Sequence, residues 1–355
     1  MKALRLREPG KPLVLEEVPV PAPDRGEVLV QVAGCGVCHT DVGFWREGVP
    51  TRASLPLTLG HEISGVVAEL GSDVTDPELL GRPVIVPAVI PCGECPLCSS
   101  GRGNVCPDQV MPGNDMDGGF AEYVRVPARG LCPVDDPGRY DLADLSVVAD
   151  AVTTPYQAVA RSGLREDDLA VVVGVGGVGT YSVQIASVLG ARVVAIDVDP
   201  KKLKVAGERG ADLTLDAATT DFRTMKARIR EAAGDWGIPP HGWKVFECSG
   251  TVAGQETAFG LMTPAGVLLL VGFTLEKGTF RLSNLMAMDA TAQGTWGCLP
   301  ELYPEALAMV TSDQVTLDGL IETHPLSSGP GVLESFADHR LDRRAILTPD
   351  ASKDT

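Results

Sequence analysis

Four cysteines stand close together in one segment of the chain: Cys92, Cys95, Cys98 and Cys106. Four thiolates at this spacing close a tetrahedral site for zinc and leave no open position for a substrate. The surrounding stretch, Pro91 to Gly119, is a long loop that needs something to hold it. The spacing therefore predicts a structural zinc site. Four unrelated thiols, disulfides or an iron–sulfur cluster are the alternatives, and a reducing compartment disfavours the disulfides.

A second set of potential metal ligands is scattered along the chain. Cys38 lies in the string GVCHTD, His61 in GHE, and Asp150 at the point where the sequence pattern changes. A thiolate, an imidazole and a carboxylate would leave a fourth position on zinc for water or an alcohol. Asp41 is the expected acceptor for the other nitrogen of His61. Each residue alone also fits an ordinary role, as a small core residue, a hydrogen-bonded histidine and a helix cap.

A glycine-rich turn follows the apolar run LAVVV and precedes a helical pattern. Its members are Gly174, Gly176, Gly177, Val178 and Gly179. Such a turn allows the pyrophosphate of a dinucleotide to approach the backbone at a helix N-terminus. The next expected strand ends at Asp197, whose carboxylate can accept both ribose hydroxyls of NAD and would repel the 2′-phosphate of NADP. Lys202 could add a ribose contact. The alternative is a structural glycine turn in another α/β protein.

The elements that must position these residues change in kind near Asp150. Before it, short Val- and Leu-rich runs predict strands, which are Leu13–Glu17, Val28–Cys35, Ile63–Leu70, Arg82–Val86 and Ala121–Val126. After it, strand and helix patterns alternate: Leu169–Val173, Val178–Leu189, Arg192–Asp197, Leu213–Leu215, Phe222–Ala233, Trp243–Cys248, Gly254–Leu261 and Val267–Val271. This alternation predicts an α/β protein with a doubly wound parallel sheet.

Composition excludes several classes of function. The 355 residues carry a net charge of −17, which disfavours nucleic-acid and membrane-surface partners. The segment Leu169–Ala191 is uncharged, but its glycine cluster indicates strand, turn and helix instead of a membrane span. The charged start MKALRLREPG shows no secretory signal, so we expect a cytoplasmic protein.

These motifs, in this order, resemble the zinc-containing alcohol dehydrogenases of the medium-chain family over nearly the whole chain. The resemblance implies a GroES-like catalytic domain at residues 1–150 with 298–355 returning to it. It implies a Rossmann NAD-binding domain at residues 151–297. It also implies two zinc ions per chain and a homodimer or homotetramer.

The resemblance also implies roles for single residues. Cys38, His61 and Asp150 would bind the catalytic zinc, with Asp150 in place of a cysteine common in the family. Glu62 would be the alternative ligand, since the family can exchange it in during turnover. Thr40 would take the substrate proton. Contacts with the cofactor would come from four residues, with His39 and Arg344 on the pyrophosphate and Val271 and Phe273 against the nicotinamide.

One departure from the family is visible after Thr40. Many members carry a histidine a few residues later that relays the proton to solvent, whereas this chain reads DVGF. The proton would then leave through the ribose hydroxyl and ordered water, or through another acid such as Asp115.

Finer strings resemble one subgroup, the 6-hydroxycyclohex-1-ene-1-carbonyl-CoA dehydrogenases of anaerobic aromatic degradation. They are NDMDGGF at 114–120, VVADAVTTPY at 147–156, FECSG at 246–250 and RLSNLM at 281–286. This subgroup resemblance implies a cyclic allylic alcohol carried on an acyl-CoA.

The sequence therefore predicts NAD-dependent, zinc-dependent oxidation of an alcohol. A general alcohol dehydrogenase for small or aromatic alcohols is one alternative. Zinc-assisted addition of water to an enoyl-CoA is another. A non-catalytic NAD-binding or redox-sensing protein on the same fold is the third, and the complete set of ligands argues against it.

Overall fold

Strands and helices alternate through residues 154–296 of the computed structural model, which describes residues 1–350 of the chain. Six parallel strands form one sheet in the order β11-β10-β9-β12-β13-β14. This is the doubly wound order in which the direction of winding reverses beside the first strand, β9. The strands are β9 (Leu169–Val173), β10 (Arg192–Asp197), β11 (Leu213–Asp216), β12 (Lys244–Glu247), β13 (Val267–Leu270) and β14 (Thr291–Gly294).

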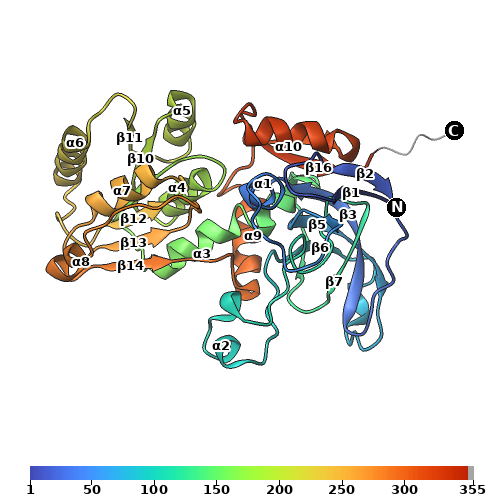
Figure 1. The fold of residues 1–355 in the computed structure, drawn as a ribbon. Helices are drawn as coiled ribbons and strands as arrows, with labels where there is room; N and C mark the ends of the chain where they lie inside the picture. Colours follow the sequence, from blue (N-terminus) through green and yellow to red (C-terminus); the bar gives the residue numbers. More distant parts are fainter. Residues whose placement is uncertain (351–355) are drawn as a thin grey trace. The chain divides into compact units, whose positions relative to one another are not determined.

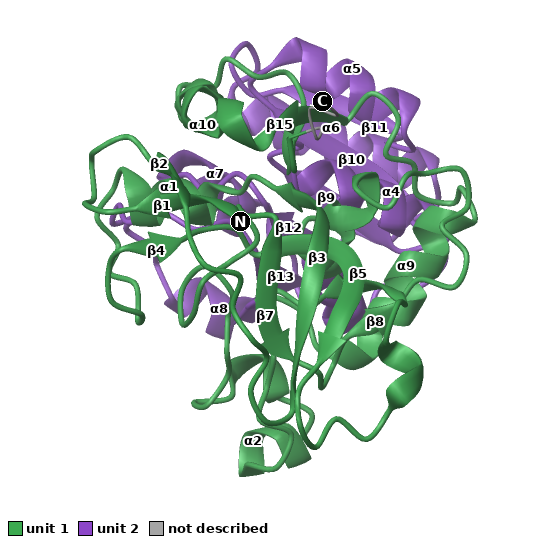
Figure 2. Cartoon of the chain, turned by 90° about the vertical axis from the view of Figure 1, so that its right-hand side faces the viewer, with its two compact units in different colours: residues 1–153, 297–355 green, residues 154–296 purple. Residues whose placement is uncertain are grey.

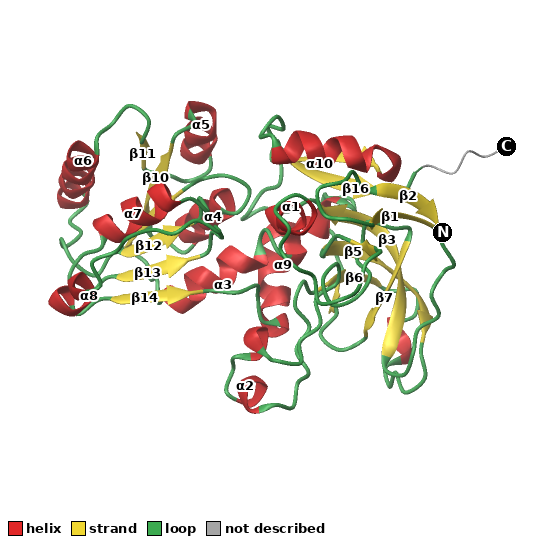
Figure 3. Ribbon diagram, in the orientation of Figure 1, coloured by secondary structure: helices red, strands yellow, loops and turns green. Residues whose placement is uncertain are grey.

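Helices pack on this sheet (Figure 3), and α6, for example, buries Met225 and Ile229 in its core. Asp199 and Asp221 cap α5 and α6, each accepting a backbone N–H of the first turn. The buried core beneath them includes Val171, Val245 and Trp243. The helices of this unit are α3 (Thr153–Ser162), α4 (Gly179–Val188), α5 (Pro200–Glu208), α6 (Phe222–Asp235), α7 (Val252–Leu261) and α8 (Ser283–Met288).

The other unit, residues 1–153 with 297–355, is rich in strands (Figures 1 and 2). Its larger sheet has the order β15-β16-β3-β5-β6-β8, with β7 also paired to β3, and a smaller sheet has the order β2-β1-β4. Its strands are β1 (Lys2–Leu6), β2 (Val14–Glu17), β3 (Glu27–Gly36), β4 (Leu57–Thr58), β5 (Glu62–Leu70), β6 (Pro83–Val86), β7 (Tyr123–Pro127), β8 (Cys132–Pro133), β15 (Ile321–Pro325) and β16 (Arg344–Thr348).

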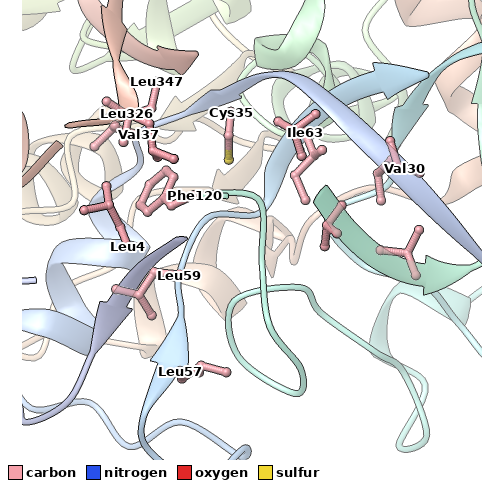
Figure 4. Packing of buried hydrophobic residues seen from close by; sticks show 14 of the residues in the cluster. Leu4, Val30, Cys35, Val37, Leu57, Leu59, Ile63, Phe120, Leu326 and Leu347 are labelled. Carbon is pink, nitrogen blue, oxygen red and sulfur yellow. The ribbon is translucent and has the colours of Figure 1, made fainter. Parts of the chain in front are cut away.

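Short helices connect and cover these strands. They are α1 (His39–Trp45), α2 (Pro96–Ser99), α9 (Tyr303–Thr311), α10 (Gly329–Ala337), and the 3₁₀ turns η1 (Pro77–Leu79), η2 (Gly103–Val105), η3 (Asp144–Ala149), η4 (Pro300–Leu302) and η5 (Leu326–Ser328). The core between them is apolar, and Figure 4 shows Phe120 packed among Leu4, Val37 and Leu59. This core fixes the edge of the sheet at which β3 ends and β5 begins.

The predicted α/β architecture is confirmed, with a β-rich unit and a doubly wound parallel sheet. The uncharged segment Leu169–Ala191 forms β9, the glycine turn and α4. Among residues 1–350, no helix combines the length and the apolar character that a membrane span requires.

Candidate active site and metal centres

Three strand ends meet at one edge of the larger sheet. β3 and β5 are antiparallel neighbours with Gly36 opposite Glu62, so the residues just beyond β3 lie beside the residues that begin β5. Cys38 follows β3 as the N-cap of α1, and His61 directly precedes β5. β16 is antiparallel to β3 on its other side, which brings its first residue, Arg344, to the same edge. The pairing of these strands therefore explains why residues far apart in sequence meet.

The predicted ligands of a catalytic metal lie together. Ligand atoms of Cys38, His61, Glu62 and Asp150 all lie within 4.8 Å of one another. The Asp150 Oδ2 atom is 3.9 Å from Cys38 Sγ and 3.8 Å from His61 Nε2. Tetrahedral zinc with bonds of about 2.0–2.3 Å holds its ligand atoms roughly 3.5 Å apart, so these residues need only small movements to share one ion. The thiolate, imidazole and carboxylate thus fit a zinc ion.

Asp41 joins the two loops that carry the ligands. Its Oδ2 accepts the N–H of Cys38 at 2.9 Å, and its Oδ1 accepts the N–H of Gly60 at 3.2 Å. The same Oδ1 lies 3.5 Å from Nδ1 of His61, longer than an ordinary hydrogen bond but within reach of an ion pair. A carboxylate behind the imidazole orients the ring and leaves Nε2 for a metal.

The charge balance of this site favours a cation. Burial acts to lower the pKa of His61, but the carboxylates of Asp41 and Asp150 and the thiol of Cys38 outweigh it and raise that pKa well above its usual value. The buried acids around the imidazole of His61 therefore favour its protonated, positively charged form. A bound zinc ion would supply that positive charge in place of the proton.

Glu62 has a partner that no sequence pattern indicated. The guanidinium of Arg344 donates from Nε to Oε2 of Glu62 at 2.9 Å and from Nη2 to Oε1, and both side chains are buried. Burial raises the pKa of Glu62, and Arg344 acts in the opposite direction. Glu62 therefore lies near the ligands, but both of its oxygens are bound by Arg344. The predicted pyrophosphate contact of Arg344 stays a prediction.

Replacing Asp150 by Asn tests which carboxylate is the ligand. We expect Asp150→Asn to lose zinc more readily or to lower kcat by roughly tenfold or more, since an amide keeps the shape but not the charge that holds the metal. Metal analysis and initial rates measure both. Asp144→Asn, in the turn that precedes Asp150, is the matched control and should keep its zinc. Full zinc and near-normal turnover in Asp150→Asn would transfer the ligand role to Glu62.

The four-cysteine cluster has the dimensions of a single tetrahedral ion. Four of its sulfur–sulfur distances are 3.8, 3.5, 3.6 and 3.4 Å. Zinc–sulfur bonds of about 2.3 Å at tetrahedral angles place sulfur atoms roughly 3.8 Å apart. A disulfide needs about 2.05 Å, and ligands of an iron–sulfur cluster bind different irons and lie farther apart. The cluster therefore fits zinc better than either alternative.

Thiol acidity in this cluster agrees with a metal site. Backbone N–H groups of Glu94 and Cys95 help lower the pKa of Cys92 to about 7, while burial helps raise the pKa of Cys98 to about 12. Thiols this close cannot all ionise without a cation between them. Cys98 lies in α2, Cys95 is the N-cap of α2 and Cys106 the C-cap of η2, on the loop that Figure 1 shows projecting from the strands of this unit.

The glycine turn after β9 has the shape a dinucleotide requires. Gly174 has φ +84°, and a Cβ there would lie 2.5 Å from the backbone of Ser249. A Cβ at Gly179 would lie 1.8 Å from the carbonyl oxygen of Gly174, so only glycine lets α4 start there. Around Gly176 the nearest atom to an added Cβ is Nζ of Lys202, at 3.9 Å. The backbone at Gly176 is thus open to a phosphate, with a cation beside it.

Asp197 ends β10 and also supports this turn. Its Oδ2 accepts the N–H of Val175 at 2.8 Å, and its Oδ1 accepts those of Val198 and Asp199 at 2.8 and 3.0 Å. Carboxylate oxygens have further lone pairs for ribose hydroxyls. The residue therefore has two tasks, to hold the turn and to offer a negative acceptor next to it.

Cofactor preference should depend on Asp197. The wild-type protein should favour NAD over NADP. Asp197→Asn should raise KM for NAD by about tenfold, because one charge and one acceptor are lost, and should lower the ratio of kcat/KM for NAD to that for NADP. Steady-state kinetics with both cofactors measures this. Asp199→Asn, which keeps the cap of α5, is the control. Equal kcat/KM for NAD and NADP in the wild type would contradict the assignment.

His39 begins α1 and lies among aromatic rings that sequence reasoning missed. Its ring centroid is 4.7 Å from that of Phe336 and 5.7 Å from that of His339. Both partners lie at the end of α10, about three hundred residues away in sequence, so no local pattern could reveal them. The contact holds the imidazole of His39 in place. Its predicted role at the pyrophosphate stays a prediction.

Thr40, one member of the predicted proton path, lies beside the candidate metal ligands. Oγ1 of Thr40 lies 3.7 Å from Sγ of Cys38, so the hydroxyl is beside the ligands. Asp115 is engaged elsewhere, with Oδ2 accepting the N–H of Met111 at 2.9 Å and Oδ1 paired with Arg52 at 3.2 Å. Both oxygens of Asp115 therefore have partners, and the predicted exit route of the proton stays a prediction.

Val271 and Phe273 follow β13 at the carboxyl edge of the parallel sheet, where open α/β sheets bind their ligands. Val271 is half-buried and Phe273 is 67% exposed. Their predicted nicotinamide contacts stay predictions.

Comparison with known proteins agrees with this geometry. The family described as "Alcohol dehydrogenase GroES-like domain" matches residues 24–136, and "Zinc-binding dehydrogenase" matches residues 177–312. An alcohol dehydrogenase of Geobacillus stearothermophilus is 36% identical over 98% of both chains. The chain belongs to the zinc-binding medium-chain alcohol dehydrogenase family. It is an oxidoreductase of the NAD-dependent zinc alcohol dehydrogenase type.

Other members of this family show its range. An L-threonine 3-dehydrogenase of Xanthomonas campestris is 32% identical, covering 92% of this chain and 93% of its own. The structure of alcohol dehydrogenase TADH from Thermus sp. ATN1 superposes with a TM-score of 0.86 at 26% identity, covering 98% of this chain and all of that one. Members as similar as these differ in substrate, so the family alone does not identify the alcohol.

Proposed function

We propose that this dehydrogenase oxidises a secondary alcohol to a ketone, with Cys38, His61 and Asp150 as the metal-binding set and Thr40 as the proton acceptor. The convergence of those three ligand types at one sheet edge, next to the Thr40 hydroxyl, carries the proposal. Zinc and NAD, when bound, supply Lewis acidity to the substrate oxygen and a hydride acceptor.

The chain's own groups do the remaining work. The Thr40 hydroxyl accepts the proton from the substrate hydroxyl and donates its own onward, so its Oγ1 is a relay position. Asp41 accepts the backbone N–H groups of Cys38 and Gly60 and thereby holds together the two loops that carry the metal ligands. Arg344 binds both oxygens of Glu62 and thereby limits competition for the metal.

For the substrate itself, we propose a cyclic allylic alcohol on an acyl-CoA, 6-hydroxycyclohex-1-ene-1-carbonyl-CoA, which would become the 6-oxo compound. The four subgroup strings and the missing histidine after Asp41 support it. The string at 114–120 also has a structural explanation. A Cβ at Gly118 would lie 2.2 Å from the carbonyl oxygen of Gly60, directly before His61, so glycine is required there for packing. The strings near Asp150 and Glu247 and the exposed 281–286 segment therefore carry more of this proposal.

A comparison of substrates tests the proposal. We expect kcat/KM for the acyl-CoA to exceed that for the free acid, cyclohexanol, benzyl alcohol, ethanol and L-threonine, because contacts far from the carbinol can be used at the transition state. A simple alcohol or the free acid equal to the thioester would leave only the general alcohol dehydrogenase function. Consumption of an enoyl-CoA without NADH formation would favour water addition instead.

We also propose that the protein is a homo-oligomer, built through the edge of the parallel sheet. β14 ends that sheet and has one strand neighbour among residues 1–350. Nearby, Leu275, Leu282 and Met286 are 59%, 68% and 78% exposed. An unpaired edge with apolar neighbours suits a second copy running antiparallel to it. Sedimentation should show a dimer or tetramer that Met286→Glu weakens, and a wild-type monomer would contradict this.

A further inference from the structure

A buried carboxylate outside the metal site has no part in the chemistry described so far. Glu247 is the last residue of β12 and is fully buried. The hydrogen bonds to its carboxylate fall on one oxygen. Oε1 accepts the N–H and the hydroxyl of Ser249 at 2.8 and 2.5 Å and the N–H of Gly250 at 3.2 Å. The other oxygen, Oε2, has no hydrogen-bond partner among residues 1–350. Burying such an oxygen is unfavourable, so its position requires an explanation.

The environment of Glu247 is two loops pressed against each other. A Cβ at Gly272 would lie 2.3 Å from the N atom of Gly250 and 2.8 Å from Oε2 of Glu247. A Cβ at Gly250, where φ is +64°, would lie 2.8 Å from the carbonyl oxygen of Phe273. No side chain larger than hydrogen fits at either position. The carboxylate therefore lies where the loop after β12 meets the loop after β13.

Glu247 also binds the loop after β13, through its backbone. Its carbonyl oxygen accepts the N–H groups of Val271 and Gly272, each at 2.9 Å. The residue thus holds one loop by its side chain and the other by its main chain. These are the loops at the carboxyl edge of the sheet, beside the reversal of winding at β9 and β12.

We infer that Glu247 is a positioning residue for the nicotinamide half of the cofactor, acting through the loops at 249–251 and 271–273. The inference rests on the proposed function, because it takes Val271 and Phe273 as the nicotinamide contacts. Glu247 touches neither the cofactor nor the substrate in this account. It sets the distance between the two loops, and with it the position of the Val271 and Phe273 backbone. In this account the adenosine half lies at Gly176 and Asp197, whereas Gly174 of the glycine turn packs against Ser249.

Binding of two ligands, NADH and ADP-ribose, distinguishes this positioning role from general damage to the fold. ADP-ribose contains the adenosine and pyrophosphate of NADH but lacks the nicotinamide. In Glu247→Gln we expect the Kd of NADH to rise about tenfold and that of ADP-ribose to stay within about twofold, measured by calorimetry on the zinc-loaded protein. Hydride transfer should slow as well, with a larger deuterium isotope effect on kcat. Glu256→Gln, an exposed acid on α7, is the matched control and should change neither Kd.

Ser249→Ala is the milder variant if Glu247→Gln folds poorly. It removes one of the three donors to Oε1 and should shift NADH binding in the same direction by a smaller factor. Equal weakening of NADH and ADP-ribose, or no change in either, would overturn the inference. A wild-type protein that binds neither ligand would overturn the proposed function instead, so the two failures are distinguishable.

Discussion

Cys38→Ser should abolish turnover and leave the fold intact. A serine oxygen binds zinc far more weakly than a thiolate, so the catalytic metal should be lost. Lewis-acid stabilisation is worth several kcal/mol, so we expect kcat to fall by roughly three orders of magnitude or more. Cys38 lies at a sheet edge as the N-cap of α1, and a serine caps a helix well. Initial rates, circular dichroism and thermal melts measure the two effects separately.

The control for this variant is another buried cysteine. Cys132 in β8 belongs to neither metal cluster, and burial helps raise its pKa to about 11. Cys132→Ser should retain its catalytic zinc and most of its turnover. Turnover equal to the wild type in Cys38→Ser would show that the residue does not hold a catalytic metal.

Cys95→Ser should have the opposite signature, a large loss of stability with a smaller direct effect on chemistry. Binding of a structural zinc contributes folding free energy, and the Pro91–Gly119 loop has little core of its own. We expect the free energy of unfolding to fall by several kcal/mol and the melting temperature by about 10 °C or more. Chelator treatment of the wild type should produce the same change.

Arg102→Ala is the control in the same loop, because its side chain is exposed and outside the sulfur cluster. It should melt at the wild-type temperature. If Cys95→Ser kept its full zinc content and its melting temperature, the cluster would not be a structural metal site.

Much of the fold could be predicted because its patterns are local. β10 was predicted at Arg192–Asp197, where the structure has it, since an apolar run bounded by turn residues leaves little freedom. α5 was missed although Asp199 and Pro200 form an ordinary helix start, so that signal was present. β1 has no such signal, because its buried residues Ala3, Leu4 and Leu6 do not alternate with exposed ones.

Part of the candidate site could be predicted from local spacing, and part of it could not. Spacing alone identified the four-cysteine cluster and the glycine turn, because their ligands are close in sequence. Three contacts depend on strands and helices that meet only in the folded chain: the pairing of Glu62 with Arg344, the tilted ring contact of His39 with Phe336, and the close approach of Gly272 to Glu247. No spacing rule connects residues so far apart, and their contacts require the sheet topology.

Zinc content of the active protein tests the central claim most directly. We predict two zinc ions per chain in the wild type, one in Cys38→Ser and one in Cys95→Ser, measured by elemental analysis after removal of loosely bound metal. The inactive protein should be Cys38→Ser, which keeps the zinc of the four cysteines. Fully active wild-type protein with one zinc ion or none would contradict the account.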